Sequence, residues 1–461
     1  MKFDLWKQIA TQVDESSQIL YNSLEEPDVW EDFVMDKIIA ELKDFLDNAH
    51  SVYHAVAALS WMLEDAGYTY LQESEDWKLL PGGKYYMSRG GSALIAFRVP
   101  YGHPRGFMIS ASHSDRPCFK LKENGELTGT YTRLATEKYG GMLMSTWLDR
   151  PLSVAGRVLV ETSCGIESRL VDVDRDLLLI PNVAIHMNRK ANEGYNWNPA
   201  VDTVALLGGK DGAGKLEQLL KENCDGDILG HDLYLYIRQK ASVWGVDEEY
   251  ISSAALDDLA SVWCCTQGFL NAADSGSIPV LCVFDSEEVG SASVQGAAST
   301  LLEGTLSRIC KSLQLDPQRQ LSRSFMVSAD NAHAVHPNHP EYADAHNAPV
   351  INGGIVLKFN AGQRYATDGV SAALFRKICA KAEVPVQTYY NRADIPGGST
   401  LGNISLSHVS VPTVDIGLPQ LAMHSCYETA GVQDAVWLQL AMQEFYSSSL
   451  NRTADGGYLI S

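Results

Sequence analysis

The hydrophobic positions near the start of the chain repeat at helical spacing. Residues 31–50 place apolar side chains three and four positions apart, which predicts an amphipathic helix. A second helix is predicted from Ser51, a favourable N-cap residue, to Gly67, where a glycine commonly ends a helix. Two continuous apolar runs follow at 93–99 and 106–112, and they predict buried strands.

The pattern changes between residues 117 and 248. Short runs that alternate apolar and polar side chains, such as GRVLVET, SRLVDVD and DLYLYIRQ, predict a β-rich segment. From residue 254 onward long helices alternate with apolar strands again, and the last helix is predicted over 432–450. We therefore expect an α/β protein, with helices flanking a mixed, mostly parallel sheet. Its main domain is predicted over 1–116 and 249–461, interrupted by a β-rich inserted domain at 117–248.

The composition is that of a globular protein with an excess of acidic residues. The 461 residues carry 36 basic and 57 acidic side chains, and this net charge of −21 argues against nucleic acid or an anionic membrane as the main partner. No apolar run reaches the roughly 18–20 residues of a membrane helix. The N-terminus lacks a signal-peptide pattern, so we expect a cytoplasmic protein. The nine cysteines are scattered without a CxxC pair, which predicts reduced thiols.

One glycine-rich stretch, GGKDGAGKL, comes close to a phosphate-binding loop. Gly209, Gly214 and Lys215 have the spacing of that motif, but a Ser or Thr must follow the lysine to hold Mg²⁺. This chain has Leu216 there. The stretch is therefore predicted to be an ordinary turn before a helix, and the sequence argues against an NTPase.

Acidic and histidine side chains gather where the predicted strands end. The residues at or shortly after these ends are His113, Asp115, Asp285, Glu287, Glu288, Asp330 and His424. Singly, each is more often a structural residue or a helix cap. Together they predict a site, because ligands bind at the carboxyl ends of strands in open α/β sheets. Buried charges at this density need a partner, either a nearby Arg or Lys or a metal ion. Histidine and carboxylate without cysteine favour Zn²⁺, Mn²⁺ or Co²⁺.

The order of motifs resembles one family, the aspartyl aminopeptidases, which are two-metal aminopeptidases. The motifs are SHSDRP (112–117), TWLDRPLSVAGRV (146–158), NVAIHMNR (182–189), LDDL (256–259), DSEEVGS (285–291), SADNAHAVHPN (328–338), QRYATD (363–368) and GLPQLAMHS (417–425). The resemblance extends from about residue 30 to 450. It implies a metal-dependent enzyme that hydrolyses the N-terminal peptide bond of peptides and prefers an N-terminal Asp or Glu.

The resemblance also implies roles for particular residues. The implied metal ligands are His113, Asp257, Asp330, Glu288 and His424, and Asp257 bridges two divalent ions, with zinc favoured over manganese or cobalt. Glu287 becomes the general base. Asp115 is expected to orient the ring of His113.

Four further positions match the family with a structural alternative left open. His186 resembles a histidine that a neighbouring subunit presents to the site, and His333 matches a further site histidine. Lys358 and Tyr365 match positions of the substrate pocket, where a lysine would attract an acidic side chain; the alternative is a surface lysine at a strand end. His336, His339 and His346 are interpreted as structural or exposed.

The chain departs from the family at two places. Asp258 follows the bridging aspartate where the family often has Asn, and the resemblance implies a cis peptide bond between Asp257 and Asp258. Gly397 replaces a cysteine of the family, which weakens the inference of acidic specificity. The alternatives are a neutral, Leu-type preference and a non-catalytic assembly subunit. The family further implies a homo-oligomer, a tetrahedral dodecamer built from dimers through the inserted domain.

Overall fold

A nine-stranded sheet forms the centre of the computed structural model, which describes residues 27–395, 397–455 and 457–461. Its strands are, in spatial order, β1 (Thr69–Tyr70), β2 (Lys84–Arg89), β3 (Ala93–Arg98), β13 (Ile278–Phe284), β4 (Phe107–His113), β14 (Phe325–Ala329), β18 (Thr413–Gly417), β16 (Ile355–Phe359) and β17 (Val386–Tyr390). The middle strands β13, β4, β14 and β18 are parallel, whereas β3 and β16 run antiparallel to them. The predicted mixed, mostly parallel sheet is confirmed.

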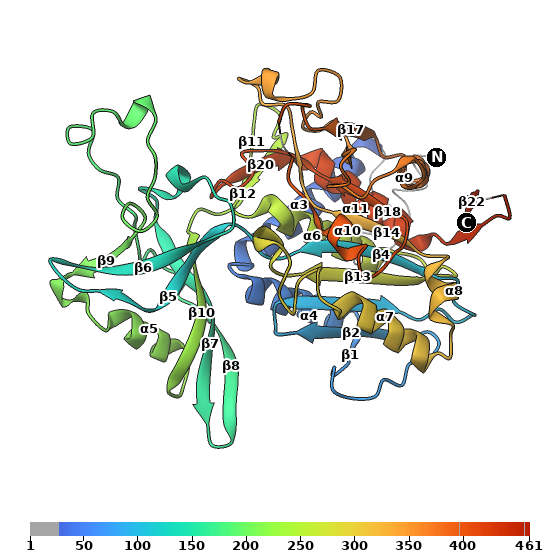
Figure 1. The fold of residues 1–461 in the computed structure, drawn as a ribbon, viewed down its shortest axis with the longest axis horizontal. Helices are drawn as coiled ribbons and strands as arrows, with labels where there is room; N and C mark the ends of the chain where they lie inside the picture. Colours follow the sequence, from blue (N-terminus) through green and yellow to red (C-terminus); the bar gives the residue numbers. More distant parts are fainter. Residues whose placement is uncertain (1–26, 396, 456) are drawn as a thin grey trace.

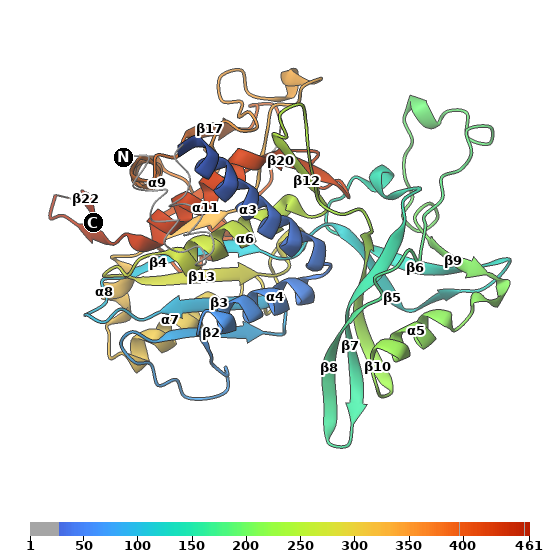
Figure 2. The ribbon, with the colours of Figure 1, turned by 180° about the vertical axis from the view of Figure 1, so that it is seen from behind.

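Helices cover both faces of this sheet. One face carries α3 (Pro27–Asn48), α4 (Val52–Asp65), α6 (Leu256–Asn271), α9 (Gly369–Lys381) and α11 (Val432–Ser447), and the other carries α7 (Leu301–Ser312), α8 (Pro317–Leu321) and α10 (Leu401–Ser405) (Figures 1 and 2). Successive side chains of β4 enter opposite cores, Met108 on the first face and Phe107 and Ile109 on the second. Burial on both faces explains why the middle strands are apolar throughout.

A second, wholly antiparallel sheet lies beside the first (Figure 1). Its strands are, in spatial order, β8 (Gly165–Asp172), β7 (Leu152–Thr162), β10 (Ile228–Ile237), β5 (Cys118–Leu127), β6 (Tyr131–Tyr139) and β9 (Ala205–Gly209). The helix α5 (Lys215–Asn223) adds Leu216 and Leu220 to the core of this sheet. The predicted turn before a helix is confirmed, since α5 begins directly after the glycine-rich stretch.

Smaller elements complete the fold. A five-stranded sheet contains β11 (Ser242–Trp244), β12 (Tyr250–Ser253), β20 (Glu428–Gly431), β19 (Pro419–Leu421) and β15 (Ala332–His333), and β21 (Leu450–Arg452) pairs with β22 (Tyr458–Ile460). The short 3₁₀ helices are η1 (Met144–Trp147), η2 (Ala191–Glu193), η3 (Lys210–Gly212), η4 (Glu287–Val289) and η5 (Pro340–Tyr342).

Two helix ends test the sequence pattern. Ser51 caps α4 as predicted, since its hydroxyl accepts the backbone N–H of His54. The prediction that the last helix reaches residue 450 was wrong, because α11 ends at Ser447 and β21 begins at Leu450. The hydroxyls of Ser447 and Ser448 donate to carbonyls four residues earlier, and such bonds compete with continuation of a helix.

Two ionic clusters join α4 and its flanks to the second sheet. The carboxylate of Asp232 accepts hydrogen bonds from Tyr53, Lys120 and Arg157. The carboxylate of Asp172 lies 2.6 Å from Nδ1 of His50 and accepts the hydroxyl of Tyr236 at 2.7 Å. His50 and Tyr53 thus connect the start of α4 to the second sheet across more than 100 residues of sequence.

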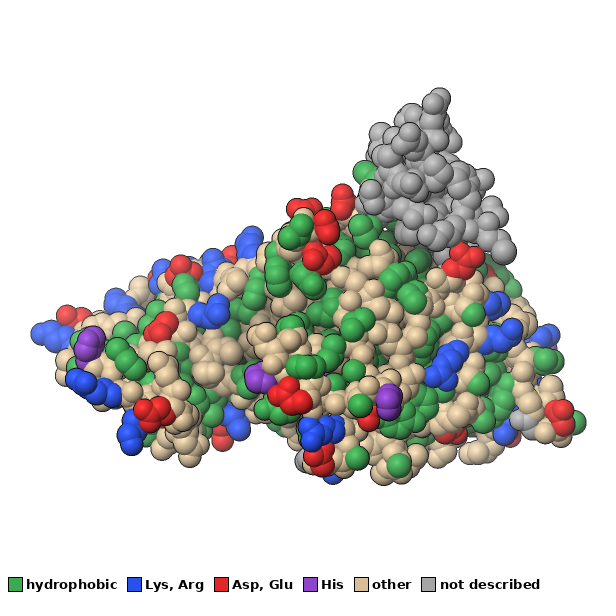
Figure 3. Space-filling model, turned by 90° about the horizontal axis from the view of Figure 1, so that it is seen from above, with side chains coloured by type: hydrophobic (Ala, Val, Ile, Leu, Met, Phe, Trp, Pro, Cys, Tyr) green, Lys and Arg blue, Asp and Glu red, His purple; other side chains and the backbone are tan. Residues whose placement is uncertain are grey.

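The surface carries charged side chains of both signs, and the cysteines are unpaired. Acidic and basic side chains are interspersed on the face shown in Figure 3. Among the described residues, no helix is both long and apolar enough to cross a membrane. All nine cysteines are free, and only Cys164 of them is exposed.

Candidate metal centre

All five predicted ligands converge at the carboxyl end of the central sheet. The candidate ligand atoms of His113, Asp257 and Asp330 lie within 4.8 Å of one another, and so do those of Asp257, Glu288 and His424. His113 ends β4 and Asp330 directly follows β14, a parallel neighbour of β4. Asp257 belongs to both groups. The geometry therefore offers two ion sites that share one carboxylate.

The two histidines present the same nitrogen to the site. Nδ1 of His113 lies 3.1 Å from the carbonyl oxygen of Asp115, and Nδ1 of His424 lies 2.6 Å from that of Gly141. A carbonyl only accepts, so Nδ1 carries the proton in each neutral ring, and Nε2 is then the nitrogen that can bind a metal ion. Those Nε2 atoms lie 3.6 Å from the two oxygens of Asp257.

The carboxylates of this centre lack the partners that their burial demands. Oδ1 of Asp257 and Oε1 of Glu288 are buried and accept no hydrogen bond from the protein. Burial raises the pKa of the Glu288 carboxyl well above its ordinary value. Burial acts in the same direction on Asp257, but His113 and His424 together outweigh it and hold the pKa of that carboxyl below its ordinary value. Orphaned carboxylate oxygens facing imidazole lone pairs fit a divalent cation with nitrogen and oxygen ligands, such as zinc.

Asp115 fixes the turn that carries the two glutamates. Its carboxylate accepts the backbone N–H groups of Glu287 at 3.0 Å and Glu288 at 3.1 Å, and the hydroxyl of Tyr139 at 2.8 Å. Nδ1 of His113 lies 3.4 Å from the carboxylate of Asp115 and closer, at 3.1 Å, to the backbone carbonyl oxygen of the same residue. Asp115 thus supports the glutamates as well as the histidine ring.

Glu287 lies beside the ligands in a largely buried position. Burial and the neighbouring carboxylates raise its pKa to about 8, although His113 acts in the opposite direction. A raised pKa favours proton exchange near neutral pH. In the same centre, the predicted cis peptide bond between Asp257 and Asp258 is present, and Asp258 accepts the backbone N–H of His113 at 3.2 Å.

Lys358 is enclosed by protein groups. It is 2% exposed, and its Nζ donates to the carbonyl oxygens of Asp330 at 2.6 Å and Asn331 at 3.2 Å. The same atom lies 3.4 Å from the carboxylate of Asp330 and 5.3 Å from the ring centre of the buried Tyr365. Lys358 therefore braces a candidate ligand, a contact that the sequence did not indicate.

The remaining predicted histidines lie outside these two groups. His333 is in β15, with its ring centre 6.0 Å from that of Tyr389. His186 is exposed in the segment 181–204 between β8 and β9, and within its own chain it joins none of the candidate ligand groups found among the described residues. His336, His339 and His346 are exposed, as expected.

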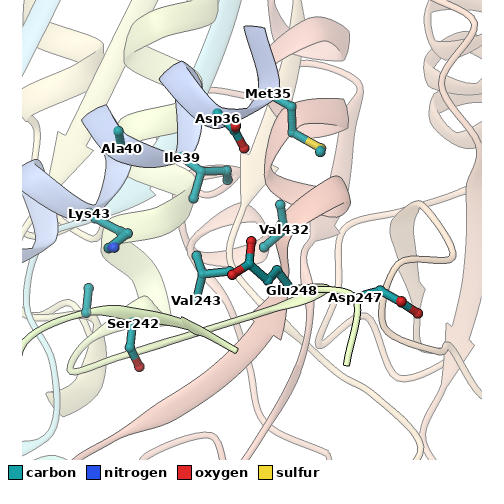
Figure 4. A pocket seen from close by; sticks show the side chains of 11 residues that line it. Met35, Asp36, Ile39, Ala40, Lys43, Ser242, Val243, Asp247, Glu248 and Val432 are labelled. Atoms are coloured by element: carbon teal, nitrogen blue, oxygen red, sulfur yellow. The ribbon is translucent and has the colours of Figure 1, made fainter. Parts of the chain in front are cut away.

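A large hollow on the molecule is separate from this centre. It has a volume of about 690 Å³ and lies between α3 and the β11–β12 hairpin (Figure 4). Its lining includes Met35, Ile39, Val243 and Val432 but none of the predicted site residues. The chemistry therefore belongs to the strand ends and not to the hollow.

Sequence reasoning missed Glu428, a buried carboxylate in the same centre. It binds the backbone of Asp257 and of His424. Its position four residues after His424 was the available signal, but that segment is neither strongly periodic nor part of a quoted motif.

Comparison with known proteins agrees with this geometry. Residues 45–446 match the aminopeptidase I zinc metalloprotease (M18) family. The probable M18 family aminopeptidase 2 of Clostridium novyi is 43% identical over 427 residues, which cover 89% of this chain and 99% of the relative. The protein of the same description in Pseudomonas aeruginosa UCBPP-PA14 is 42% identical over 420 residues, covering 88% and 97%.

Solved structures show the same fold. The complex of Ape4 and Nbr1 contains a chain with a TM-score of 0.86 and 33% identity, covering 90% of this chain and 86% of that one. The mApe1 dodecamer of S. cerevisiae gives a TM-score of 0.79 and 26% identity, covering 90% and 97%. Fold and site define a metal-dependent hydrolase of α/β architecture. The chain belongs to the M18 family of zinc metalloproteases and is a metalloaminopeptidase.

Proposed function

We propose that this aminopeptidase binds two divalent ions, zinc in the first place, and that His113, Asp257 and Asp330 hold one while Asp257, Glu288 and His424 hold the other. The observation that carries the proposal is the pair of ligand groups sharing Asp257. Each group has three protein ligands, which leaves room for water and substrate. The substrates are peptides, cleaved at the first peptide bond.

Glu287 is the general base of this proposal. When bound, a pair of such ions polarises a water molecule and the scissile carbonyl. Glu287 takes the proton of the attacking water and returns it to the leaving nitrogen. Asp115 holds the turn of Glu287 in place through its backbone N–H. His333 and, from a neighbouring subunit, His186 contact the substrate.

For the N-terminal side chain we propose a preference for Asp or Glu. Support comes from the positive charge of Lys358 beside Asp330 and Tyr365. The alternative, a preference for neutral residues such as Leu, is favoured by a different feature of the same lysine. Its Nζ already donates to two carbonyls, which leaves less of its hydrogen-bonding capacity for a substrate carboxylate.

A substrate panel decides between the two preferences. We would assay aminoacyl-aminocoumarins of Asp, Glu, Leu and Lys with added Zn²⁺, Mn²⁺ or Co²⁺. The acidic preference predicts kcat/KM for Asp or Glu at least about tenfold above Leu, about 1.4 kcal/mol of transition-state discrimination. Preference for Leu would establish the alternative.

The variant Lys358→Met completes this test. If Lys358 attracts the substrate carboxylate, the ratio of Asp to Leu turnover falls in the variant. If Lys358 only braces Asp330, both substrates slow by the same factor and the ratio stays constant.

We propose that residues 117–248 form an oligomerisation domain and that the enzyme is a cytoplasmic homo-oligomer, a tetrahedral dodecamer built from dimers. One structural neighbour is described as a dodecamer. In this chain, Val183, Ile185 and Met187 are exposed apolar side chains on either side of His186. Such a cluster is typical of a surface that another subunit covers.

A further inference from the structure

A single buried carboxylate connects two of the candidate ligands. Glu428 begins β20, is 1% exposed and divides its oxygens between two backbone groups. One oxygen accepts the N–H of Asp257 at 2.9 Å, and the other accepts the N–H of His424 at 2.7 Å. Asp257 and His424 belong to the same candidate ion site, but Asp257 is in α6 and His424 is in the turn between β19 and β20.

Both backbones need this support. Asp257 lies in the first turn of α6, where φ −86° and ψ 104° are not helical, and the preceding Ala255 supplies no side-chain cap. Its N–H is thus one of the donors that a helix start leaves without an internal partner. His424 has φ +65°, a left-handed conformation that non-glycine residues seldom adopt. The carboxylate of Glu428 accepts the N–H of Asp257 and also holds the backbone of His424 in its left-handed conformation.

We propose that Glu428 is a positioning residue that sets the separation of Asp257 and His424 and thereby the affinity of the ion site formed by Asp257, Glu288 and His424. The inference rests on the proposed two-ion function. Glu428 itself belongs to none of the candidate ligand groups among the described residues, and each of its oxygens accepts a backbone hydrogen bond. Mutation of a residue that orients metal ligands typically lowers metal affinity by about 10–100-fold.

The test is a metal titration of the full-length oligomer. In Glu428→Gln the amide nitrogen cannot accept, so one of the two N–H groups loses its partner. We expect the affinity of one step of a Zn²⁺ titration against a chelating dye to fall by about 10–100-fold. The visible spectrum of the Co²⁺-loaded protein should change as well, and that readout does not depend on turnover.

Asp434 provides a matched control. This carboxylate is also buried and also accepts two backbone N–H groups, from Asn352 at 2.6 Å and Gly354 at 2.9 Å. It belongs to none of the candidate ligand groups among the described residues. Asp434→Asn should lower the Tm and leave metal affinity and the Co²⁺ spectrum unchanged.

The outcomes separate this inference from the function on which it rests. Unchanged metal affinity in Glu428→Gln, or equal losses in Glu428→Gln and Asp434→Asn, would overturn the positioning role. If Glu428→Gln does not assemble, Glu428→Asp keeps the charge but shortens the reach, and the same shift of one titration step is expected. A wild-type enzyme that binds fewer than two ions per subunit would instead overturn the proposed function.

Discussion

Glu287 and Glu288 are adjacent in the chain but differ in their surroundings. Glu288 lies 3.4 Å from Nε2 of His424 and shares a ligand group with it and Asp257. Glu287 is held by its backbone N–H to Asp115, and its carboxyl has a pKa raised to about 8 mainly by burial. We propose Glu288 as the ligand because it faces Asp257 and His424, and Glu287 as the base, although Glu287 also lies within ligand distance of His113 and Glu288.

This division predicts opposite phenotypes for two isosteric changes. Glu287→Gln should lower kcat by about 10²–10⁴-fold, because the amide cannot accept the proton of the attacking water, while two ions remain bound. Glu288→Gln should lose one ion. Activity assays combined with metal analysis of the dialysed proteins check both. Substantial turnover in Glu287→Gln would assign the base to another group.

The largely buried His54 makes the stability of the folded chain depend on pH in the acidic range. Burial lowers its pKa to about 4, with His50 and Arg116 acting in the same direction and Asp172 opposing them. The unfolded chain, with a histidine pKa near about 6.5, binds a proton between pH 6.5 and 4 that the folded chain does not bind. Stability is therefore lost as the pH falls through this window, by up to about 3 kcal/mol.

The variant His54→Gln removes this proton-linked loss. Denaturant midpoints at pH 7 and pH 5 should differ less in His54→Gln than in wild type. An equal pH dependence in the two proteins would show that folding does not lower the pKa of His54.

At the scale of elements, local sequence patterns predicted the strands, because the apolar pattern of a strand is formed by residues close together in the sequence. The runs 93–99, 106–112 and 278–284 indicated buried strands because their apolar side chains enter cores on both faces. The strand ends indicated the centre because parallel strands bring their carboxyl ends together. Contacts such as that of Lys358 with Asp330 could not be predicted, since they depend on how separate elements meet in space.

A glycine in β7 shows how closely the elements of the second sheet meet. Gly156 faces Leu233 of β10, has φ +156°, and a Cβ there would lie 2.0 Å from the carbonyl oxygen of Asp232. Gly156→Ala should destabilise the sheet by about 1–3 kcal/mol, because backbone must move to relieve the overlap. Thermal melting checks this. Gly165→Ala is the control, since a Cβ at Gly165 meets no atom within 4 Å, and it should leave the Tm nearly unchanged.

At the scale of the whole molecule, the candidate centre and His186 belong to different parts of the chain. The ligands lie at the end of the central sheet, whereas the segment 181–204 projects from the second sheet (Figures 1 and 2). A histidine that serves the centre from this position would have to come from a neighbouring subunit. In a dimer with twofold symmetry, each subunit would then complete the site of the other.

Mixing two inactive enzymes tests this exchange. His186→Ala keeps its own Glu287, and Glu287→Gln keeps its own His186. In a mixed dimer, the site with intact Glu287 receives an intact His186, so random re-assembly should restore about a quarter of wild-type activity. The measurement is the aminopeptidase rate after co-expression, with each variant alone as the control. If His186 served its own chain, every mixed site would lack one of the two groups and the rate would not exceed the sum of the separate variants.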